Sequence, residues 1–202
     1  MPGWMGAKRH DLYRISPASP CRLHAVVFGS SVGLRAWRGF AVTAEEWALA
    51  ASVFLTGLAP GLLGMLSTIM RPMLAAMDGR DFRTFMEAFL RYADHGWGKV
   101  FNYAWSLGMG IGPIIALVLL WDDPGSSSFV LTAIGLGVVI AGVYVVSNVW
   151  KEPLYQVILA WNPEAMPADW EAARRRYFTI NWIQFATTWG ALGLFLVALI
   201  SL

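Results

Sequence analysis

The chain of 202 residues is 57% hydrophobic and only 14% charged and contains 11 tryptophans, a composition that excludes an ordinary soluble domain and favours a lipid environment. Its single cysteine, Cys21, excludes an intramolecular disulfide bond and any zinc or iron–sulfur site built on several thiolates. The net charge of +2 comes from scattered basic residues, so no nucleic acid partner is expected.

The chain opens with a tail, residues 1–44, which contains several prolines and serines but no sustained apolar period. We expect this tail to be poorly ordered. Its short apolar run at 23–34 lacks a cleavage signature, which argues against a signal peptide. An alternative is that part of the tail lies upstream of the true start of translation, because the ordered pattern begins only at the helix opening Thr43-Ala44-Glu45-Glu46.

Four later stretches contain no Asp, Glu, Lys or Arg and are long enough to cross a bilayer. A helix rises about 1.5 Å per residue and the hydrocarbon core is about 30 Å thick, so roughly 20 apolar residues suffice. In lipid the backbone has to satisfy its own hydrogen bonds, which makes each stretch a helix. The sequence therefore predicts an all-α fold, an integral membrane four-helix bundle formed by residues 45–202, with spans at about 47–70, 100–121, 129–150 and 180–202.

Small residues recur at four-residue spacing inside these stretches, and such pairs let the backbones of membrane helices approach closely. They are Gly57 and Gly61, Gly108 and Gly112, Gly137 and Ala141, and Ala186 and Gly190. This spacing favours a compact bundle.

The connection between the first and second spans predicts an interfacial amphipathic helix. Asp78-Gly79 forms a turn, and Asp81 can cap a helix in which apolar residues recur at three- and four-residue steps. These apolar residues are Phe82, Phe85, Met86, Phe89 and Leu90. A helix with one such face is expected to lie at the membrane surface.

The connection between the third and fourth spans contains two predicted helix openings, Asn162-Pro163 and Pro167-Ala168-Asp169. The second opening leads directly into a segment at 170–176 that continues into the fourth span. Three consecutive arginines in this segment are expected at the membrane surface, where anionic lipid favours them.

The orientation in the membrane follows from the positions of Lys and Arg, since short loops rich in these residues stay in the cytoplasm. The first and third connections are rich in them, whereas the second carries Asp122 and Asp123 and has neither Lys nor Arg. Before the first span, only Arg35 and Arg38 lie within the range over which this rule operates. We therefore predict a multi-pass protein of the cell (inner) membrane with both termini outside and loops 71–99 and 151–179 in the cytoplasm.

The second half of the chain carries residues that resemble a known family. They are Ser147-Asn148-Val149, Pro153-Leu154, Ala160-Trp161-Asn162-Pro163-Glu164, Pro167-Ala168-Asp169-Trp170, Arg174-Arg175-Arg176-Tyr177 and Asn181. This set resembles the second half of the anthrone oxygenase-like proteins, and the resemblance covers roughly residues 47–202. Trp150-Lys151-Glu152 interrupts the family's Asn-Val-Pro-Leu-Asn run, Tyr155 replaces its second Asn, and Gln184 stands where an Arg is usual. The resemblance implies a four-span fold and oxygenase chemistry on a polycyclic aromatic.

Three amides are expected at one membrane depth, because Asn148 ends the third span while Asn181 and Gln184 begin the fourth. Amides there can hydrogen-bond the oxygen of a hydrophobic aromatic ligand such as a phenol, quinone or anthrone. Aromatic rings that can stack on such a ligand are those of Trp150, Trp182 and Tyr177. These residues form the predicted substrate site.

Glu152 and Asn148 are the predicted catalytic residues. Glu152 is the one carboxylate beside the amides and can take a proton from an activated C–H or O–H, a step needed before a carbanion reacts with oxygen. The alternative is that the amides tie the helices together and that Glu152 pairs with Lys151, Arg174 or Arg175 at the interface. No histidine lies inside a span, so we expect neither a metal nor a cofactor.

The sequence leaves three functions open. The first is a cofactor-independent oxygenase-like enzyme acting on a quinol-like or polycyclic aromatic, with a cavity that Asn148 and Asn181 face. The second is a non-catalytic membrane scaffold or accessory subunit, in which the amides face other helices and a small-residue face stays open for a helix-packing protein partner. The third is a protein that binds a lipid or hydrophobic metabolite in the same cavity without any need for Glu152.

Overall fold

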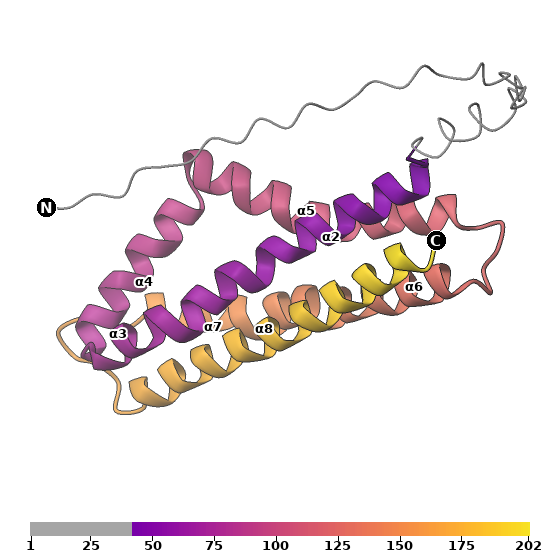
Figure 1. The fold of residues 1–202 in the computed structure, drawn as a ribbon. Helices are drawn as coiled ribbons and strands as arrows, with labels where there is room; N and C mark the ends of the chain where they lie inside the picture. Colours follow the sequence, from indigo (N-terminus) through magenta and orange to yellow (C-terminus); the bar gives the residue numbers. More distant parts are fainter. Residues whose placement is uncertain (1–41) are drawn as a thin grey trace, which may run out of the picture. The chain divides into compact units, whose positions relative to one another are not determined.

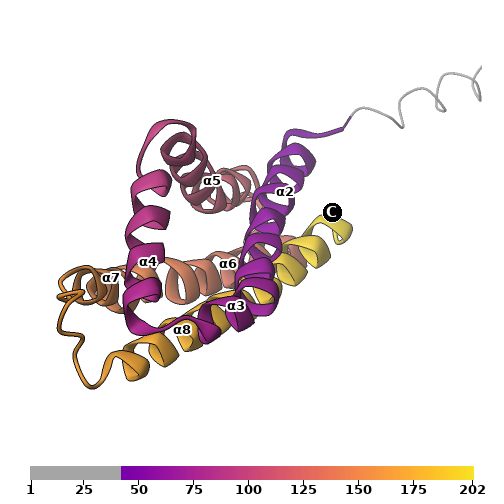
Figure 2. The same ribbon diagram turned by 90° about the vertical axis from the view of Figure 1, so that its left-hand side faces the viewer.

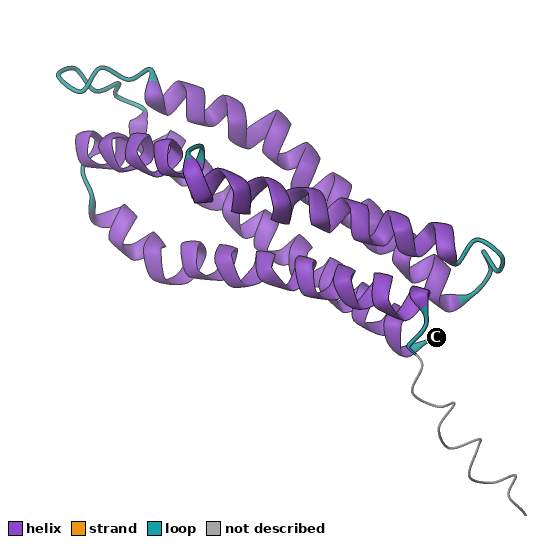
Figure 3. Ribbon diagram, turned by 90° about the horizontal axis from the view of Figure 1, so that it is seen from above, coloured by secondary structure: helices purple, strands orange, loops and turns teal. Residues whose placement is uncertain are grey.

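The structure is a computed structural model that describes residues 42–202, so the predicted tail lies outside the described residues except for its last three positions. Secondary structure in the described part is helical, apart from one isolated bridge between Asn162 and Ala165 (Figure 3). The predicted all-α fold is confirmed.

Four long helices are apolar enough to cross a membrane, which confirms the predicted multi-pass bundle (Figure 1). They are Ala44–Ala76, Gly96–Leu119, Ser127–Leu159 and Trp170–Ile200. The first consists of α2 (Ala44–Gly64), the π-helical segment η2 (Met65–Met70) and α3 (Arg71–Ala76), and the second is α5 (Gly96–Leu119). The third consists of α6 (Ser127–Val139), the π-helical segments η3 (Ile140–Val145) and η4 (Ser147–Lys151), and α7 (Glu152–Leu159), while the fourth is α8 (Trp170–Ile200).

Local capping chemistry explains where these helices begin. The Thr43 hydroxyl accepts a hydrogen bond from the Glu46 backbone N–H at 3.2 Å, and the Glu46 carboxylate accepts one from the Thr43 N–H at 2.7 Å. This reciprocal pair is the predicted helix opening of α2. The fourth helix begins at Trp170, directly after Asp169, as predicted, although the Asp169 side chain forms no capping hydrogen bond.

The amphipathic helix between the first and second spans is α4 (Gly79–Ala93), but its capping residue is Asp78 rather than the predicted Asp81. The Asp78 backbone is extended, and its carboxylate accepts the Asp81 N–H at 2.8 Å. Asp81 lies in the first turn instead, where its negative charge is favourable near the positive end of the helix dipole. Figure 2 shows α4 between the end of α3 and the start of α5.

The predicted helix opening at Asn162-Pro163 is wrong, because the chain forms a tight turn there. The Asn162 side-chain oxygen accepts the Glu164 N–H at 3.0 Å, and the Asn162 carbonyl accepts the Ala165 N–H at 3.1 Å. An Asn that bonds the backbone two residues ahead stabilises a turn in competition with a helix.

The bundle is organised around α8, which packs against both α2 and α6, while α5 packs mainly against α2. The glycine spacing accounts for the closeness of α5 and α2, since a Cβ added at Gly108 would lie 2.7 Å from a methyl carbon of Leu55. Other small residues of the predicted pairs face outward, and no atom lies within 4 Å of a Cβ added at Gly61, Gly137 or Gly190.

The largest buried cluster lies at the end of the bundle formed by α3, α4, α7 and the start of α8, which we call the basic end. Its fully or almost fully buried members include Leu74, Phe82, Met86, Ile158 and Tyr177. Because the first, third and fourth helices continue past the predicted spans to form this cluster, the two basic connections become one packed unit.

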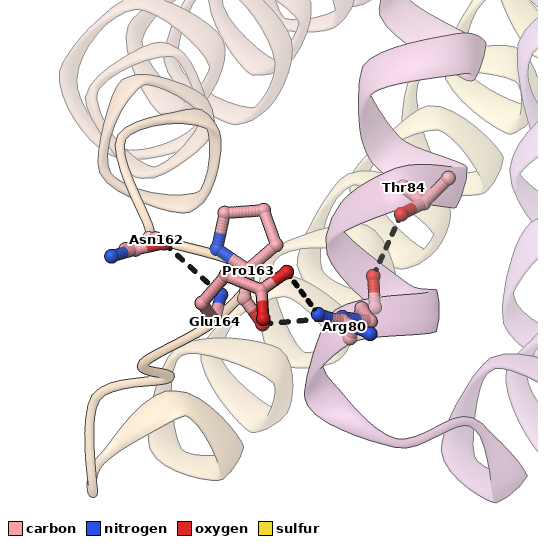
Figure 4. Close-up of polar contacts among 5 residues, drawn as sticks. All are labelled: Arg80, Thr84, Asn162, Pro163 and Glu164. Atoms are coloured by element: carbon pink, nitrogen blue, oxygen red, sulfur yellow. Dashed lines mark hydrogen bonds and ion pairs between the residues drawn. The ribbon is translucent and has the colours of Figure 1, made fainter.

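Arginine side chains join the two basic connections by hydrogen bonds and an ion pair. Arg80 on α4 donates to the Pro163 carbonyl at 3.2 Å and forms an ion pair with Glu164 (Figure 4). Arg174 on α8 donates to the carbonyls of Leu74 at 3.3 Å and Met77 at 2.6 Å. Arg174 thus satisfies two carbonyls at the end of the first helix, which lack partners inside that helix.

Candidate functional site

One face of α8 carries polar side chains into the interior of the bundle. Tyr177, Asn181, Gln184 and Thr188 are at most 3% exposed and recur at steps of four, three and four residues. Positions with this spacing share one face of a helix. Three of the seven predicted site residues, Tyr177, Asn181 and Gln184, are therefore brought together in the interior.

A hydrogen-bonded chain connects this face of α8 to the third helix. The Lys151 Nζ donates to Gln184 Oε1 at 2.8 Å, and Gln184 Nε2 donates in turn to Ser147 Oγ at 2.8 Å. A longer bond of 3.5 Å runs from Gln184 Nε2 to the Val143 carbonyl. Ser147 and Lys151 begin and end η4, and π-helical turns of this kind occur frequently at functional sites.

Lys151 is partly buried and forms no ion pair with a carboxylate of residues 42–202. The ion pairs found within residues 42–202 join Arg80 to Glu164, Arg83 to Glu87 and Arg175 to Glu171. A lysine ammonium has three N–H donors, and the one hydrogen bond that Lys151 donates to another described residue uses a single donor. The ammonium therefore retains donors and positive charge for an oxygen atom of a ligand.

Two buried oxygen atoms near these hydrogen-bonded side chains, Asn181 Oδ1 and Ser67 Oγ, have no hydrogen-bond partner among the described residues. Ser67 lies in η2, which packs against α8. A Cβ added at Gly64 would lie 3.1 Å from the Phe185 ring, and the two helices run antiparallel (Figure 1), so Ser67 lies at about the depth of Asn181. An unpaired buried polar atom costs about 1–3 kcal/mol, and such an atom in a native structure calls for a water or ligand.

The other predicted site residues lie on the outer surface. Asn148 is exposed, and its Nδ2 donates to the Tyr144 carbonyl of the same helix at 2.7 Å. Glu152 is also exposed and forms no ion pair among the described residues. Trp150 and Trp182 are 44% and 38% exposed. The structure thus separates these four side chains from the buried face of α8.

Sequence reasoning treated Lys151 only as a possible partner of Glu152 and assigned no role to Ser147. Lys151 and Ser147 precede the buried residues Leu154 and Ile158 by helical steps, but that burial is known only from the structure, so the sequence offered no independent signal for them. The third span was predicted to end before Lys151, whereas the helix continues to Leu159. We call Ser147, Lys151, Tyr177, Asn181 and Gln184 the junction cluster.

Within residues 42–202, no three His, Cys, Asp or Glu side chains gather where they could hold a metal ion. The chemistry that the junction cluster offers is instead that of an ammonium, two amides and two hydroxyls. Comparisons with protein-family models, with characterised proteins and with solved structures find none that matches this chain.

Proposed function

We propose that this chain binds a quinol-like or polycyclic aromatic molecule at the junction of its third and fourth helices and oxidises it with molecular oxygen, as the resemblance to anthrone oxygenases implies. The observation that carries the proposal is the Lys151 ammonium, which is partly buried and hydrogen-bonded to Gln184 and forms no ion pair within the described residues. Ionisable residues inside membrane bundles are costly and by default indicate functional sites.

Lys151 and Asn181 can perform different parts of this chemistry. When an anthrone loses a proton from its CH₂ group to water, negative charge collects on its carbonyl oxygen, and a nearby ammonium stabilises that charge. The resulting carbanion reacts with O₂; one oxygen atom becomes the new carbonyl of the anthraquinone, and the other leaves as water with the two hydrogens of the CH₂ group. The buried amide of Asn181 can orient the bound ring by hydrogen bonding. The proposal rests on Lys151 rather than Glu152, because the Glu152 side chain is exposed.

The test is oxygen uptake and anthraquinone formation by the purified protein supplied with an anthrone. We expect Lys151→Met to lower turnover by about 10- to 100-fold, since a hydrogen bond to a charged group is worth about 1.5–3 kcal/mol. Arg176→Met is the matched control, because Arg176 is an exposed cation on α8 that forms no ion pair with any of residues 42–202. Equal turnover in the folded native protein and Lys151→Met, or no turnover at all, would refute the proposal.

A membrane scaffold is the second candidate, and it is favoured by the open small-residue face. Gly61 on α2 and Gly190 and Gly193 on α8 have no atom within 4 Å of an added Cβ, and these two helices pack against each other. Faces of this kind suit a partner helix. If the scaffold proposal holds, Gly61→Leu and Gly190→Leu release a co-purifying membrane partner while Lys151→Met does not.

We further propose that the protein lies in the cell (inner) membrane with its basic end in the cytoplasm. The support is the concentration of Lys and Arg at that end and the presence of Asp122 and Asp123 in the loop at the other.

A further inference from the structure

An open apolar pocket of about 530 Å³ lies between η2, α4 and the first turn of α5, and it shares no residue with the junction cluster. Its volume falls within the range of roughly 300–1,000 Å³ that is usual for ligand pockets. The lining residues are Met65, Met70, Phe85, Ala88, Phe89, Tyr92, Ala93 and Gly98. The pocket therefore offers a ligand almost no polar partner except at Tyr92.

The walls of the pocket are anchored in the core of the basic end. Met70 and Phe85 pack against the buried cluster there, and the rings of Phe85 and Phe89 stack with their centroids 6.0 Å apart. The methionines add flexible, polarisable surface that adapts to an irregular apolar ligand. The packing of α4 and η2 therefore holds the walls of the pocket in place.

Two basic side chains lie next to this apolar lining. The Arg91 guanidinium lies over the ring of the lining residue Tyr92, 5.3 Å from its centroid. Lys99 directly follows the lining residue Gly98, and its exposed ammonium lies over the Tyr103 ring, 5.8 Å from the centroid. Two acidic residues neighbour the lining in sequence. Asp94 follows the lining residue Ala93, and Glu87 precedes Ala88 and forms an ion pair with Arg83. The surroundings are therefore basic, which complements an anionic group.

We propose that this pocket holds an acyl chain of an anionic phospholipid, with the phosphate bound by Arg91 and Lys99. The pocket lies where the apolar part of the first helix gives way to the basic end, so one molecule there needs both an apolar chain and a negative head. Phospholipid is the molecule of a bilayer that has both, and basic side chains near the surface attract its anionic forms. This proposal is independent of the proposed oxidation at the junction cluster.

The experiment compares phosphatidylglycerol and phosphatidylcholine that carry the same photoactivatable group on the acyl chain, each reconstituted with the full chain and mapped by peptide mass spectrometry. Phosphatidylglycerol is expected to label η2 and α4 in preference to phosphatidylcholine. Replacing Arg91 and Lys99 by Gln should reduce this preference about fivefold for each cation removed. Arg176→Gln, an exposed cation at the same end, should leave the preference unchanged.

A second variant tests the pocket itself. Ala88→Trp fills the apolar space and should reduce labelling of η2 and α4 by either lipid, whereas Ile134→Trp on the exposed surface of α6 should not. Circular dichroism and gel filtration establish that each variant is folded, and the charge variants test the proposal even if Ala88→Trp does not fold. Equal labelling by the two lipids, or unchanged labelling in folded Ala88→Trp, would overturn the proposal.

Discussion

Gln184 is the residue on which the junction cluster depends most, because it accepts from Lys151 and donates to Ser147 at the same time. Removing it leaves an ammonium and a hydroxyl without these partners. Removing Lys151 as well as Gln184 leaves no unpaired ammonium, so only the Ser147 hydroxyl loses its donor. Replacing both partners of a buried polar pair is often nearly neutral.

We therefore expect Gln184→Leu to lower the free energy of unfolding by about 2–3 kcal/mol, and the double variant Lys151→Met/Gln184→Leu to recover most of that loss. Thermal or denaturant unfolding in detergent measures the stability of both variants. Additive losses in the double variant would show that the two side chains do not interact.

Gly135 and Gly137 give a second test at the scale of single residues. A Cβ added at Gly135 would lie 2.6 Å from a ring carbon of Phe195 on α8, whereas nothing lies within 4 Å of a Cβ added at Gly137. Gly135→Ala should destabilise the protein by about 1–3 kcal/mol through overpacking. Gly137→Ala, two residues away in the same helix, should be neutral or slightly stabilising. Equal effects of the two substitutions on the unfolding temperature would contradict the packing of α6 on α8.

At the scale of elements, Arg174 attaches α8 to the end of the first helix through the Leu74 and Met77 carbonyls and also lies over the Trp170 ring, 4.5 Å from its centroid. The neighbouring Arg175 forms an ion pair with Glu171, and both side chains are exposed. Comparing variants of the two arginines therefore separates the effect of a cation bonded to another helix from the effect of a cation exposed to solvent.

Arg174→Ala is expected to cost about 1–3 kcal/mol and to speed backbone hydrogen exchange in α3, because two carbonyls lose their donor. Arg175→Ala should cost less than about 0.5 kcal/mol, as exposed helix ion pairs do. Unchanged exchange in α3 after Arg174→Ala would mean that this docking does not hold the two connections together.

The spans and the first helix opening could be predicted because they depend on local chemistry, namely charge-free stretches and the Thr43–Glu46 capping pair. The docking of Arg174 onto Leu74 could not, because a hydrogen bond between residues 100 positions apart leaves no periodic pattern. Asn181 and Gln184 share the buried face of α8, but position along a helix alone does not decide which face of that helix a residue occupies.

Asn148 illustrates the difference between position along a helix and the face of that helix. It has the expected place along the third helix, yet it is exposed while Lys151 contacts α8. The π-helical segments η3 and η4 contribute, because a π turn holds an extra residue and changes which later side chains face the neighbouring helix. The 3.6-residue period of an ordinary α-helix does not include the extra residue of a π turn, so it does not predict this change of face.

At the scale of the whole molecule, the proposed orientation predicts which loops are reachable from outside the cell. In a Cys21→Ser background, Asp123→Cys in the second connection should react with a membrane-impermeant maleimide in intact cells, because that loop carries no Lys or Arg. Ala168→Cys, exposed at the basic end, should react only after the cells are lysed. The reverse pattern would place the basic end outside.

The central claim is that the junction cluster binds the oxygen of a hydrophobic aromatic, and equilibrium binding of an anthraquinone tests it without depending on turnover. Titration of the purified protein, followed by tryptophan quenching, should give saturable binding that weakens by about tenfold or more in Lys151→Met and remains unchanged in Arg176→Met. Equal affinity in the native protein and both variants, or no saturable binding, would contradict this account of the site.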